Sequence, residues 1–271
     1  MDYNKVIRSI STDQHEILYN IMMMHNGGGA YDCDMTYSIG NFYGKFMVDS
    51  PDGEKSEIVI PAPEHKFDVC PQVDGVVQID PDGLLPLEDK SIGSMVIDLP
   101  FVVSCGPSLD KPSRDEKGNK SMTNIISKRF AWYYPVANLL KSYKHWIFEA
   151  YRVLKDDGLM VFKTQATITG GKMLNTPYFS RMMAEAAGFD SLDEFVLIAK
   201  NRLISGKVKT QQHARSFHSY FLCFRKSQSK KVMYFDFMDN DELIETMSMA
   251  VDNNLSKKRR GCLKITDSME A

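Results

Sequence analysis

Short apolar runs alternate with longer amphipathic stretches along most of this 271-residue chain. Apolar side chains recur at helical spacing in three stretches, which predict helices near 11–25, 134–154 and 178–187. Apolar runs of strand length predict strands near 30–34, 65–69, 75–79, 94–97, 159–163, 195–199 and 217–224. The polar, turn-rich stretch 49–64 surrounds a short apolar run and predicts a hairpin or an excursion.

The order of these elements predicts an α/β fold with a mainly parallel sheet and helices on both faces. The last two predicted strands have no helix between them, so we expect one antiparallel strand near an edge of the sheet. The chain then divides into an N-terminal helical extension (1–29), a main domain (30–226) and a C-terminal segment (227–271). We expect the C-terminal segment to hold an acidic helix and a basic, flexible tail.

One stretch of the main domain, residues 104–129, is long, polar and interrupted by glycine and proline. A connection of this length inside a compact domain is usually functional or mobile. It carries six Lys or Arg residues, which makes it a candidate lid or a loop that enters a nucleic-acid groove. An excursion without such a role fits the same composition.

The composition is that of an ordinary globular protein, with 43% hydrophobic and 25% charged residues. No apolar run approaches the roughly 20 residues of a membrane span, and the N-terminus lacks the features of a signal peptide. The five cysteines are scattered without a CxxC pair, which favours free thiols in a reducing cytoplasm over a metal site. We therefore expect a cytoplasmic protein with no metal and no membrane partner.

Charge is separated along the chain, although the formal net charge is only −2. Nine residues between Lys200 and Lys231 are Lys or Arg and none is acidic, whereas residues 236–252 hold six acidic residues. A basic segment of this kind creates a local positive field that suits a polyanion such as nucleic acid. A solvated surface without a partner is the alternative.

The clearest chemical signal is the tetrapeptide Asp98-Leu99-Pro100-Phe101, which directly follows an apolar strand. Ligands of open parallel sheets bind outside the carboxyl ends of the strands, so this carboxylate lies where a site is expected. The Asp98 carboxylate and the Leu99 carbonyl can both accept hydrogens of an exocyclic amine, which makes its nitrogen more nucleophilic. Pro100 favours an extended Leu99, and Phe101 offers a ring on which a base can stack. An Asp-initiated turn would have the same local sequence.

Three segments resemble class-I S-adenosylmethionine (SAM)-dependent methyltransferases of the DNA amino-methyltransferase type. Residues 84–101, LLPLEDKSIGSMVIDLPF, resemble that family's L-P-hydrophobic-x-D-x-S, its buried strand and its [DN]-P-P-[YF]. Residues 152–158, RVLKDDG, resemble its R-V-L-K-P-G-G turn, and residues 186–189, AAGF, resemble its A-G-F. The resemblance covers residues 30–226 and implies a Rossmann-like methyltransferase fold with SAM as the cofactor.

The resemblance also implies which residues hold the cofactor. The loop 34–42 is similar to the family's D-P-F-x-G-S-G-T, whose backbone amides hold the methionine part of SAM. Asp68 corresponds to the acidic residue that accepts the ribose hydroxyls, and Asp80 to the residue that reads the adenine amine. For both aspartates a turn or a helix cap is the alternative. The implied cofactor residues are Asp34, Ser38, Gly40, Asp68 and Asp80.

Two positions depart from the family pattern. Ser38 stands where glycine is common, so the loop lacks a full G-x-G, and Leu99 replaces the first proline of the tetrapeptide. The backbone carbonyl at position 99 survives this change, whereas the rigidity of a second proline does not. These departures favour a rival hypothesis, a catalytically silent, methyltransferase-like protein that binds nucleic acid.

Residues 200–220 combine basic, amide and aromatic side chains, which can contact phosphates, base edges and base faces. The two histidines have no cysteine or carboxylate close in the sequence, which favours nucleic-acid contact or a satisfied hydrogen bond over metal ligation. The candidate substrate-binding residues are Lys200, Arg202, Gln212, His213, Arg215 and His218.

Taken with the resemblance, the sequence predicts an enzyme that methylates an exocyclic amino group of a nucleic-acid base. DNA is favoured over RNA by the resemblance alone. The chain is short for a sequence-specific enzyme of this type, so a homodimer or a specificity subunit is an expected partner. A role in restriction-modification is the corresponding biological expectation. A methyltransferase acting on a protein amide or a small molecule is the remaining rival.

Overall fold

An eight-stranded sheet forms the centre of the computed structural model, which describes residues 6–49, 55–103, 113–114, 120–121, 133, 135–200, 213–214 and 216–227. Across the sheet the strands follow the order β1 (Ile10–Ser11), β13 (Phe189–Ile198), β14 (His218–Lys226), β10 (Leu154–Thr164), β7 (Ile92–Ile97), β2 (Cys33–Asp34), β5 (His65–Asp68) and β6 (Val77–Gln78). Only β14 runs antiparallel to its neighbours in this sheet. The predicted parallel sheet with one reversed strand near an edge is therefore confirmed, and the fold is a Rossmann-like α/β fold.

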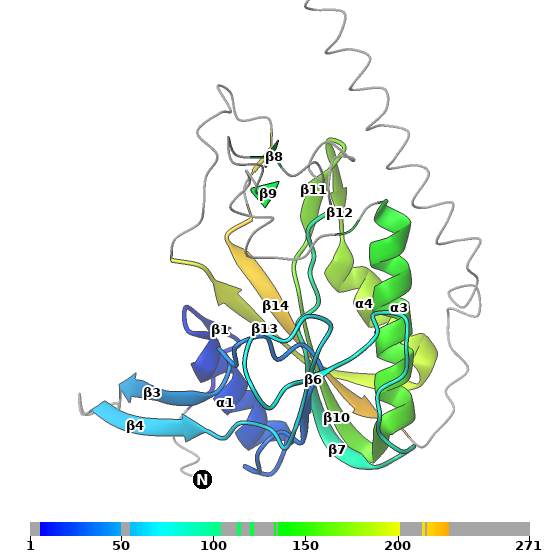
Figure 1. The fold of residues 1–271 in the computed structure, drawn as a ribbon. Helices are drawn as coiled ribbons and strands as arrows, with labels where there is room; N and C mark the ends of the chain where they lie inside the picture. The colour runs from blue at the N-terminus through cyan, green and yellow to red at the C-terminus, as the bar shows by residue number, and fades with distance from the viewer. Residues whose placement is uncertain are drawn as a thin grey trace, which may run out of the picture.

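Two hydrophobic clusters cover the two faces of the sheet. Successive strand side chains point to opposite faces, so Val96 belongs to one cluster and Ile97 to the other. The helices of the described residues are α1 (Gln14–His25), α3 (Val136–Val153) and α4 (Thr176–Ala187). Helices α3 and α4 pack on one face (the α3–α4 face), and α1 packs on the other (the α1 face; Figure 1). The prediction of helices on both faces is confirmed.

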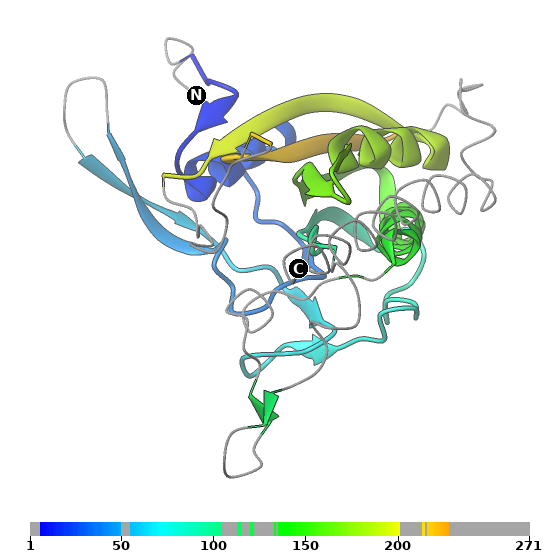
Figure 2. The same cartoon turned by 90° about the horizontal axis from the view of Figure 1, so that it is seen from above.

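A hairpin, and not a helix, connects β2 to β5. Parallel neighbours usually need a helical crossover, but here β3 (Gly44–Asp49) pairs antiparallel with β4 (Lys55–Ile60). Phe46 and Ile60 anchor the hairpin in the cluster beneath α1. The rest of the hairpin projects away from the sheet (Figure 2). The hairpin expected near 49–64 is thus confirmed, although it begins earlier in the chain.

The segment around Gly188 shows why glycine is needed between α4 and β13. Gly188 ends α4 with a φ of 109°, a left-handed conformation that favours glycine. A Cβ atom at this position would lie 2.9 Å from the Tyr151 ring of α3. Both the backbone conformation and the close packing of α3 therefore account for the A-G-F segment.

Two small hairpins were not predicted from the sequence. β11 (Thr167–Thr169) pairs with β12 (Lys172–Leu174) through Gly170 and Gly171, whose φ values of 60° and 77° fit a tight hairpin turn. β8 (Ser113–Arg114) pairs with β9 (Lys120–Ser121) inside the predicted 104–129 insertion, which otherwise lies outside the described residues. The segment 227–271 lies outside them too, apart from Ser227. No helix in the described ranges is long and apolar enough to cross a membrane.

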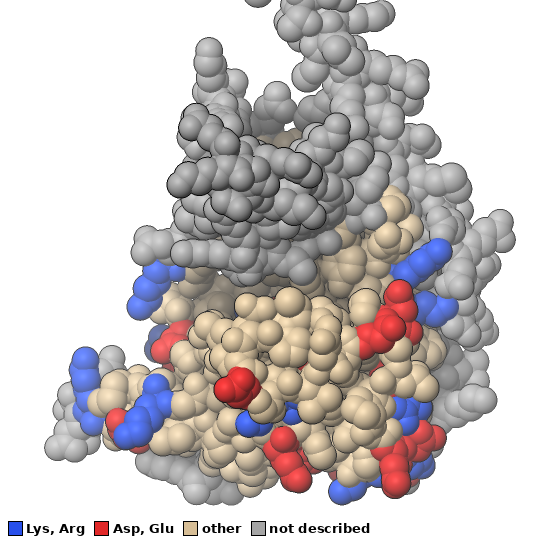
Figure 3. Space-filling model, viewed as in Figure 1, with Lys and Arg blue, Asp and Glu red and all other residues tan. Residues whose placement is uncertain are grey.

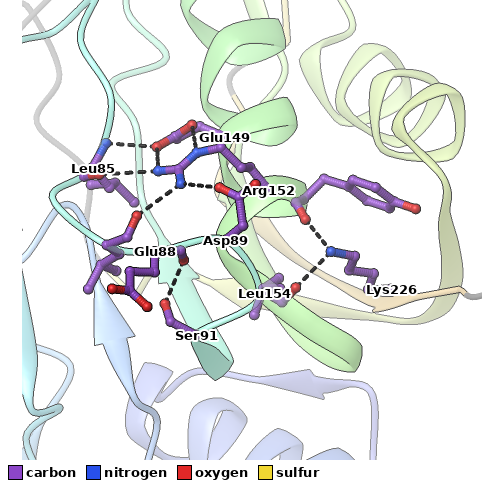
Figure 4. A network of polar contacts seen from close by, with 10 residues as sticks. Leu85, Glu88, Asp89, Ser91, Glu149, Arg152, Leu154 and Lys226 are labelled. Atoms are coloured by element: carbon purple, nitrogen blue, oxygen red, sulfur yellow. Dashed lines mark hydrogen bonds and ion pairs between the residues drawn. The ribbon is translucent and has the colours of Figure 1, made fainter.

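A buried polar network joins two of the sequence motifs at the end of α3 (Figure 4). The Glu149 side chain, 4% exposed, accepts the Leu85 N–H at 2.7 Å and binds the Arg152 guanidinium at 2.6 Å. Arg152 also donates to the backbone carbonyls of Leu85 and Leu87. The L-P segment before β7 and the R-V-L-K segment before β10 are therefore parts of one contact, which holds α3 at the start of two central strands.

We expect Glu149→Ala to lower the free energy of unfolding by about 2–4 kcal/mol, because it leaves the Leu85 N–H and the Arg152 guanidinium without their acceptor. Urea denaturation measures the loss. The matched control is Glu194→Ala, which removes the carboxylate of a half-exposed ion pair with Arg181. It should cost at most about 1 kcal/mol. Equal losses for the two variants would contradict the importance of the network.

Candidate active site

The candidate site lies along the edge where the parallel strands β7, β2 and β5 end (the carboxyl edge). From β2 the chain adds β5 and β6 on one side, and it then returns to add β7 and β10 on the other side. The order of the strands therefore reverses between β2 and β7, which makes this pair a topological switch point. Asp34 is the last residue of β2, and Asp98 follows β7 directly. Since Asp34 pairs with Val96, both aspartates lie at this point.

The Asp98 carboxylate is bound by a lysine from the next strand. Lys163 of β10 donates to Asp98 Oδ2 at 2.9 Å, and the two side chains are 14% and 26% exposed. The Lys163 ammonium lies 4.8 Å from the centre of the Phe42 ring and 5.6 Å from that of Phe221. The Asp98 N–H donates to Thr36 Oγ1 at 2.7 Å. The carboxylate is therefore fixed in place while part of it stays open to solvent.

The rest of the tetrapeptide is held by the α3–α4 face. The Leu99 side chain is 5% exposed and packs in the cluster beneath α3, which explains an aliphatic residue where the family has proline. The Pro100 carbonyl accepts the Tyr143 hydroxyl at 3.3 Å. Phe101 is half-buried, so part of its ring remains exposed for a stacking contact.

The Asp34 side chain supports, from within the protein, the loop that follows β2. The carboxylate is 0% exposed and accepts the Thr36 N–H, the Thr36 hydroxyl and the Tyr43 hydroxyl. Burial raises the pKa of Asp34 to about 7, against the opposing effect of these hydrogen bonds. Burial, with the nearby Asp34, also raises the pKa of Tyr43. The Asp34 side chain thus has no surface for a ligand and instead fixes the loop that follows β2.

This loop has the backbone shape that its glycine pattern suggests. Ser38 has a φ of 51° and Gly40 a φ of 76°, both in the left-handed region. A Cβ atom at Gly40 would lie 2.5 Å from the Tyr37 hydroxyl, so no other residue fits there without movement. Ser38 therefore adopts a left-handed conformation that glycine would adopt more easily, at a modest cost in strain.

Asp68, which the resemblance assigns to the ribose hydroxyls, lies against this loop. Its two oxygens accept the backbone N–H groups of Ser38 at 2.9 Å and Cys70 at 2.8 Å. A carboxylate oxygen has two acceptor positions, so each oxygen keeps one for a ribose hydroxyl. Asp68 thus keeps acceptor positions that fit the ribose hydroxyls of SAM, whereas the N–H groups of Ser38 and Gly40 are bound within the protein, by Asp68 and by the Tyr37 carbonyl.

Asp80 lies close to Asp68 but is bound in a turn. β5 and β6 are paired with Asp68 opposite Gln78, so Asp80 follows at the same edge of the sheet. Asp80 is exposed and its Oδ1 accepts the Asp82 N–H at 2.9 Å. The turn that the sequence offered as the alternative is therefore present.

Two of the candidate substrate residues, Lys200 and His218, lie at the same edge, where β13 ends and β14 begins. β14 begins at His218, whose ring packs edge-on against Tyr220 at 5.2 Å. Lys200 follows β13 and is exposed, as is His213. Gln165, just beyond β10, donates to the Ser216 carbonyl and so joins this segment to the carboxyl edge. The other three candidates, Arg202, Gln212 and Arg215, lie outside the described residues.

Two of the nine basic residues counted between 200 and 231 serve the interior of the protein. Lys226, 4% exposed, donates to the carbonyls of Tyr151 and Leu154. Arg225 donates to the carbonyls of Asp157 and His25. On the face shown in Figure 3, the described acidic and basic side chains are interspersed. The expected positive field therefore depends on Lys200 and on residues outside the described ranges.

Four residues of the site, Phe42, Tyr43, Thr36 and Lys163, were not among the sequence candidates. Lys163 had a signal in the sequence, because it is a charged residue in the predicted strand 159–163, whose other members are apolar. The others lie in or near a loop whose aromatic residues have no period. No group of three or more His, Cys, Asp or Glu side chains that could hold a metal occurs among the residues the structure describes.

No protein-family model and no curated protein matches the sequence. Among solved structures, the chain is similar to a candidate DNA modification methylase from Thermus thermophilus, with a TM-score of 0.32 and 14% identity over 56% of this chain and 51% of that chain. That protein has also been crystallised with SAM.

The chain is also similar to SAM-dependent methyltransferases from Methanosarcina mazei and Thermotoga maritima. The first has a TM-score of 0.37 and 9% identity over 76% of this chain and 98% of that one. The second has a TM-score of 0.35 and 10% identity over 79% and 91%. The match spans about half the length of the Thermus protein. The strand order of the sheet, and not these distant likenesses, assigns the fold.

The raised pKa of Asp34 predicts a pH dependence of stability. The folded protein keeps this proton up to about pH 7, whereas the unfolded chain releases it near pH 3.8. The contribution of this protonated carboxyl to the free energy of unfolding is therefore fully present below about pH 4 and is lost as the pH rises to about 7. Relative to Asp34→Asn, the wild type should lose about 4 kcal/mol over this interval and then level off. Chemical denaturation of both proteins at a series of pH values measures the difference, and a constant difference would contradict the burial of a protonated Asp34.

Proposed function

We propose that this protein is a SAM-dependent methyltransferase that methylates an exocyclic amino group of a nucleic-acid base, with DNA as the favoured substrate. The observation that carries the proposal is the position of the Asp98 carboxylate. It is partly open and lies at the topological switch point of the sheet, beside the loop that contacts Asp68. An amine acceptor and a cofactor-binding loop therefore share one edge.

The cofactor would lie over the ends of β2, β5 and β6. The loop 34–42 would lie along its methionine part, and Asp68 suits its ribose hydroxyls. Adjacent strands are about 4.8 Å apart, so Asp98 lies about 10 Å from Asp68 along the edge. That spacing suits a cofactor whose ribose is at Asp68 and whose sulfonium points toward Asp98.

When bound, SAM supplies an electrophilic methyl group on a sulfonium. Asp98 and the Leu99 carbonyl accept the two amine hydrogens and direct the nitrogen lone pair toward that methyl carbon. The new nitrogen–carbon bond forms as the carbon–sulfur bond breaks, and the amine proton passes to solvent or to Asp98. Phe101 packs on the base. These acceptors need no rearrangement during the reaction, which is the main source of electrostatic catalysis.

The choice of substrate rests on the basic segment and on the sequence resemblance. Lys200 and His218 come to the carboxyl edge and can contact phosphates and base edges, and His213 is exposed five residues before His218. The resemblance favours DNA, and a base would have to leave its stack to reach Asp98. Protection of DNA from restriction is the role that fits such an enzyme. A second subunit or a homodimer would supply recognition surface.

The ion pair between Asp98 and Lys163 favours a second candidate, a silent methyltransferase-like protein that binds nucleic acid. A carboxylate already bound to an ammonium is a weaker acceptor for a substrate amine. Tritiated-methyl transfer to DNA, RNA and protein in parallel separates the two functions, with digestion to identify the modified nucleoside. Label in a methylated adenine or cytosine supports the enzyme. Salt-sensitive nucleic-acid binding without transfer to any substrate supports the silent protein.

Asp98→Ala should lower methyl transfer by about 100-fold or more, because it removes an acceptor that acts on the reacting nitrogen. The Kd for SAM, measured by calorimetry, should change little. Asp156→Ala is the matched control, since it removes a carboxylate that pairs with Lys90 at the opposite edge of the sheet. Undiminished transfer by the Asp98 variant would refute its assignment.

Asp68→Ala should raise the Kd for SAM by about tenfold or more, because hydrogen bonds to a carboxylate contribute about 1.5–3 kcal/mol. Isothermal titration gives the Kd directly. Asp74→Ala, an exposed aspartate in the neighbouring loop, serves as the control and should bind SAM as the wild type does. An unchanged Kd for the Asp68 variant would count against its contact with the ribose.

A further inference from the structure

We infer that Lys163 is a positioning residue of the transfer site, which holds one oxygen of Asp98 so that the other faces the substrate amine. The inference rests on the proposed function and names a residue that the resemblance does not supply. It also accounts for the ion pair that would otherwise favour a silent protein.

Strand register places Lys163 opposite Asp98. Phe162 of β10 pairs with Ile97 of β7, so the next residue on each strand lies at the same level beyond the pair. Side chains alternate between the two faces along each strand, so Asp98 and Lys163 point to the α1 face, as Val96 and Val161 do. The contact between the lysine and the carboxylate is therefore a consequence of the sheet and not of a chance rotamer.

Aromatic rings enclose the ammonium on the same face. Lys163 pairs with Phe221 across β10 and β14, and Phe42 comes from the loop after β2. With 14% of the lysine side chain exposed, the rings confine the cation and add cation–π attraction. An exposed Lys–Asp pair contributes little because both side chains must be ordered in water. Here packing has already ordered the lysine.

Two contacts then determine how Asp98 points. Thr36 accepts the backbone N–H of Asp98, and Lys163 binds Oδ2. Rotation of the carboxylate would break the second contact, so Oδ1 is held as the acceptor for an incoming amine hydrogen. Thr36 in turn donates to the buried Asp34. A chain of contacts therefore runs from the core at Asp34, through the loop, to the reacting group.

Steady-state kinetics of Lys163→Met and Lys163→Arg, on the nucleic acid that the wild type methylates, test the inference. We expect Lys163→Met to lower kcat about 10- to 100-fold while the Kd for SAM changes less than about twofold, because an ill-positioned acceptor affects the reaction more than binding. Lys163→Arg keeps the cation and should recover most of kcat. Arg181→Met, which breaks the Arg181–Glu194 pair outside the site, should match the wild type.

A double-mutant cycle with Asp98→Asn separates positioning from a merely structural role. If Lys163 acts through Asp98, Lys163→Met should lower kcat far less in the Asp98→Asn background than in the wild type. Should Lys163→Met fail to fold, Lys163→Gln replaces it in the same cycle. The inference would be overturned if Lys163→Met lowers kcat by the same factor in the wild type and in the Asp98→Asn background. It would also be overturned if kcat is unchanged or raised in Lys163→Met. A wild type that methylates no substrate would instead refute the proposed function, and the inference with it.

Discussion

Parallel pairing of β2 with β7 is the constraint on which the site depends. It brings the ends of two strands that are far apart in sequence, at Asp34 and Val96, into one register. Next to β2, strand β5 adds Asp68 to the same edge, and next to β7, strand β10 adds Lys163. Backbone hydrogen bonds between the strands therefore set the order of these side chains along the edge. The alternation of side chains along each strand then decides on which face of the sheet each of them lies.

Buried polar groups fix this edge more firmly than its loops alone could. Asp34 at the end of β2 uses its buried carboxylate to hold Thr36 and Tyr43, and Thr36 in turn accepts the Asp98 amide. At the other end of β7, Glu149 and Arg152 fasten α3 to the preceding loop. Both ends of the strand that carries Asp98 are thereby anchored, which suits a site whose acceptors must be placed before substrate arrives.

The sequence predicted the layers of the fold and the place of Asp98 because these follow from periodicity and strand ends. It could not predict that the Asp34 carboxylate is buried, since burial there depends on Tyr43 folding back over it. Nor could it separate Arg225 and Lys226, which serve backbone carbonyls, from the basic residues around them. The contact between Lys163 and Asp98 joins positions 65 residues apart, and only the sheet register reveals it.

The central claim is that the Asp98 carboxylate faces the space that receives the methyl donor. The most direct test is a crystal structure of the full chain with S-adenosylhomocysteine, in which the distance from the cofactor sulfur to the Asp98 carboxylate is measured. The account predicts a ribose at Asp68 and a sulfur within about 8 Å of Asp98, which leaves room for a methyl group and an amine in line. A cofactor bound elsewhere, or a sulfur that points away from Asp98, would contradict it.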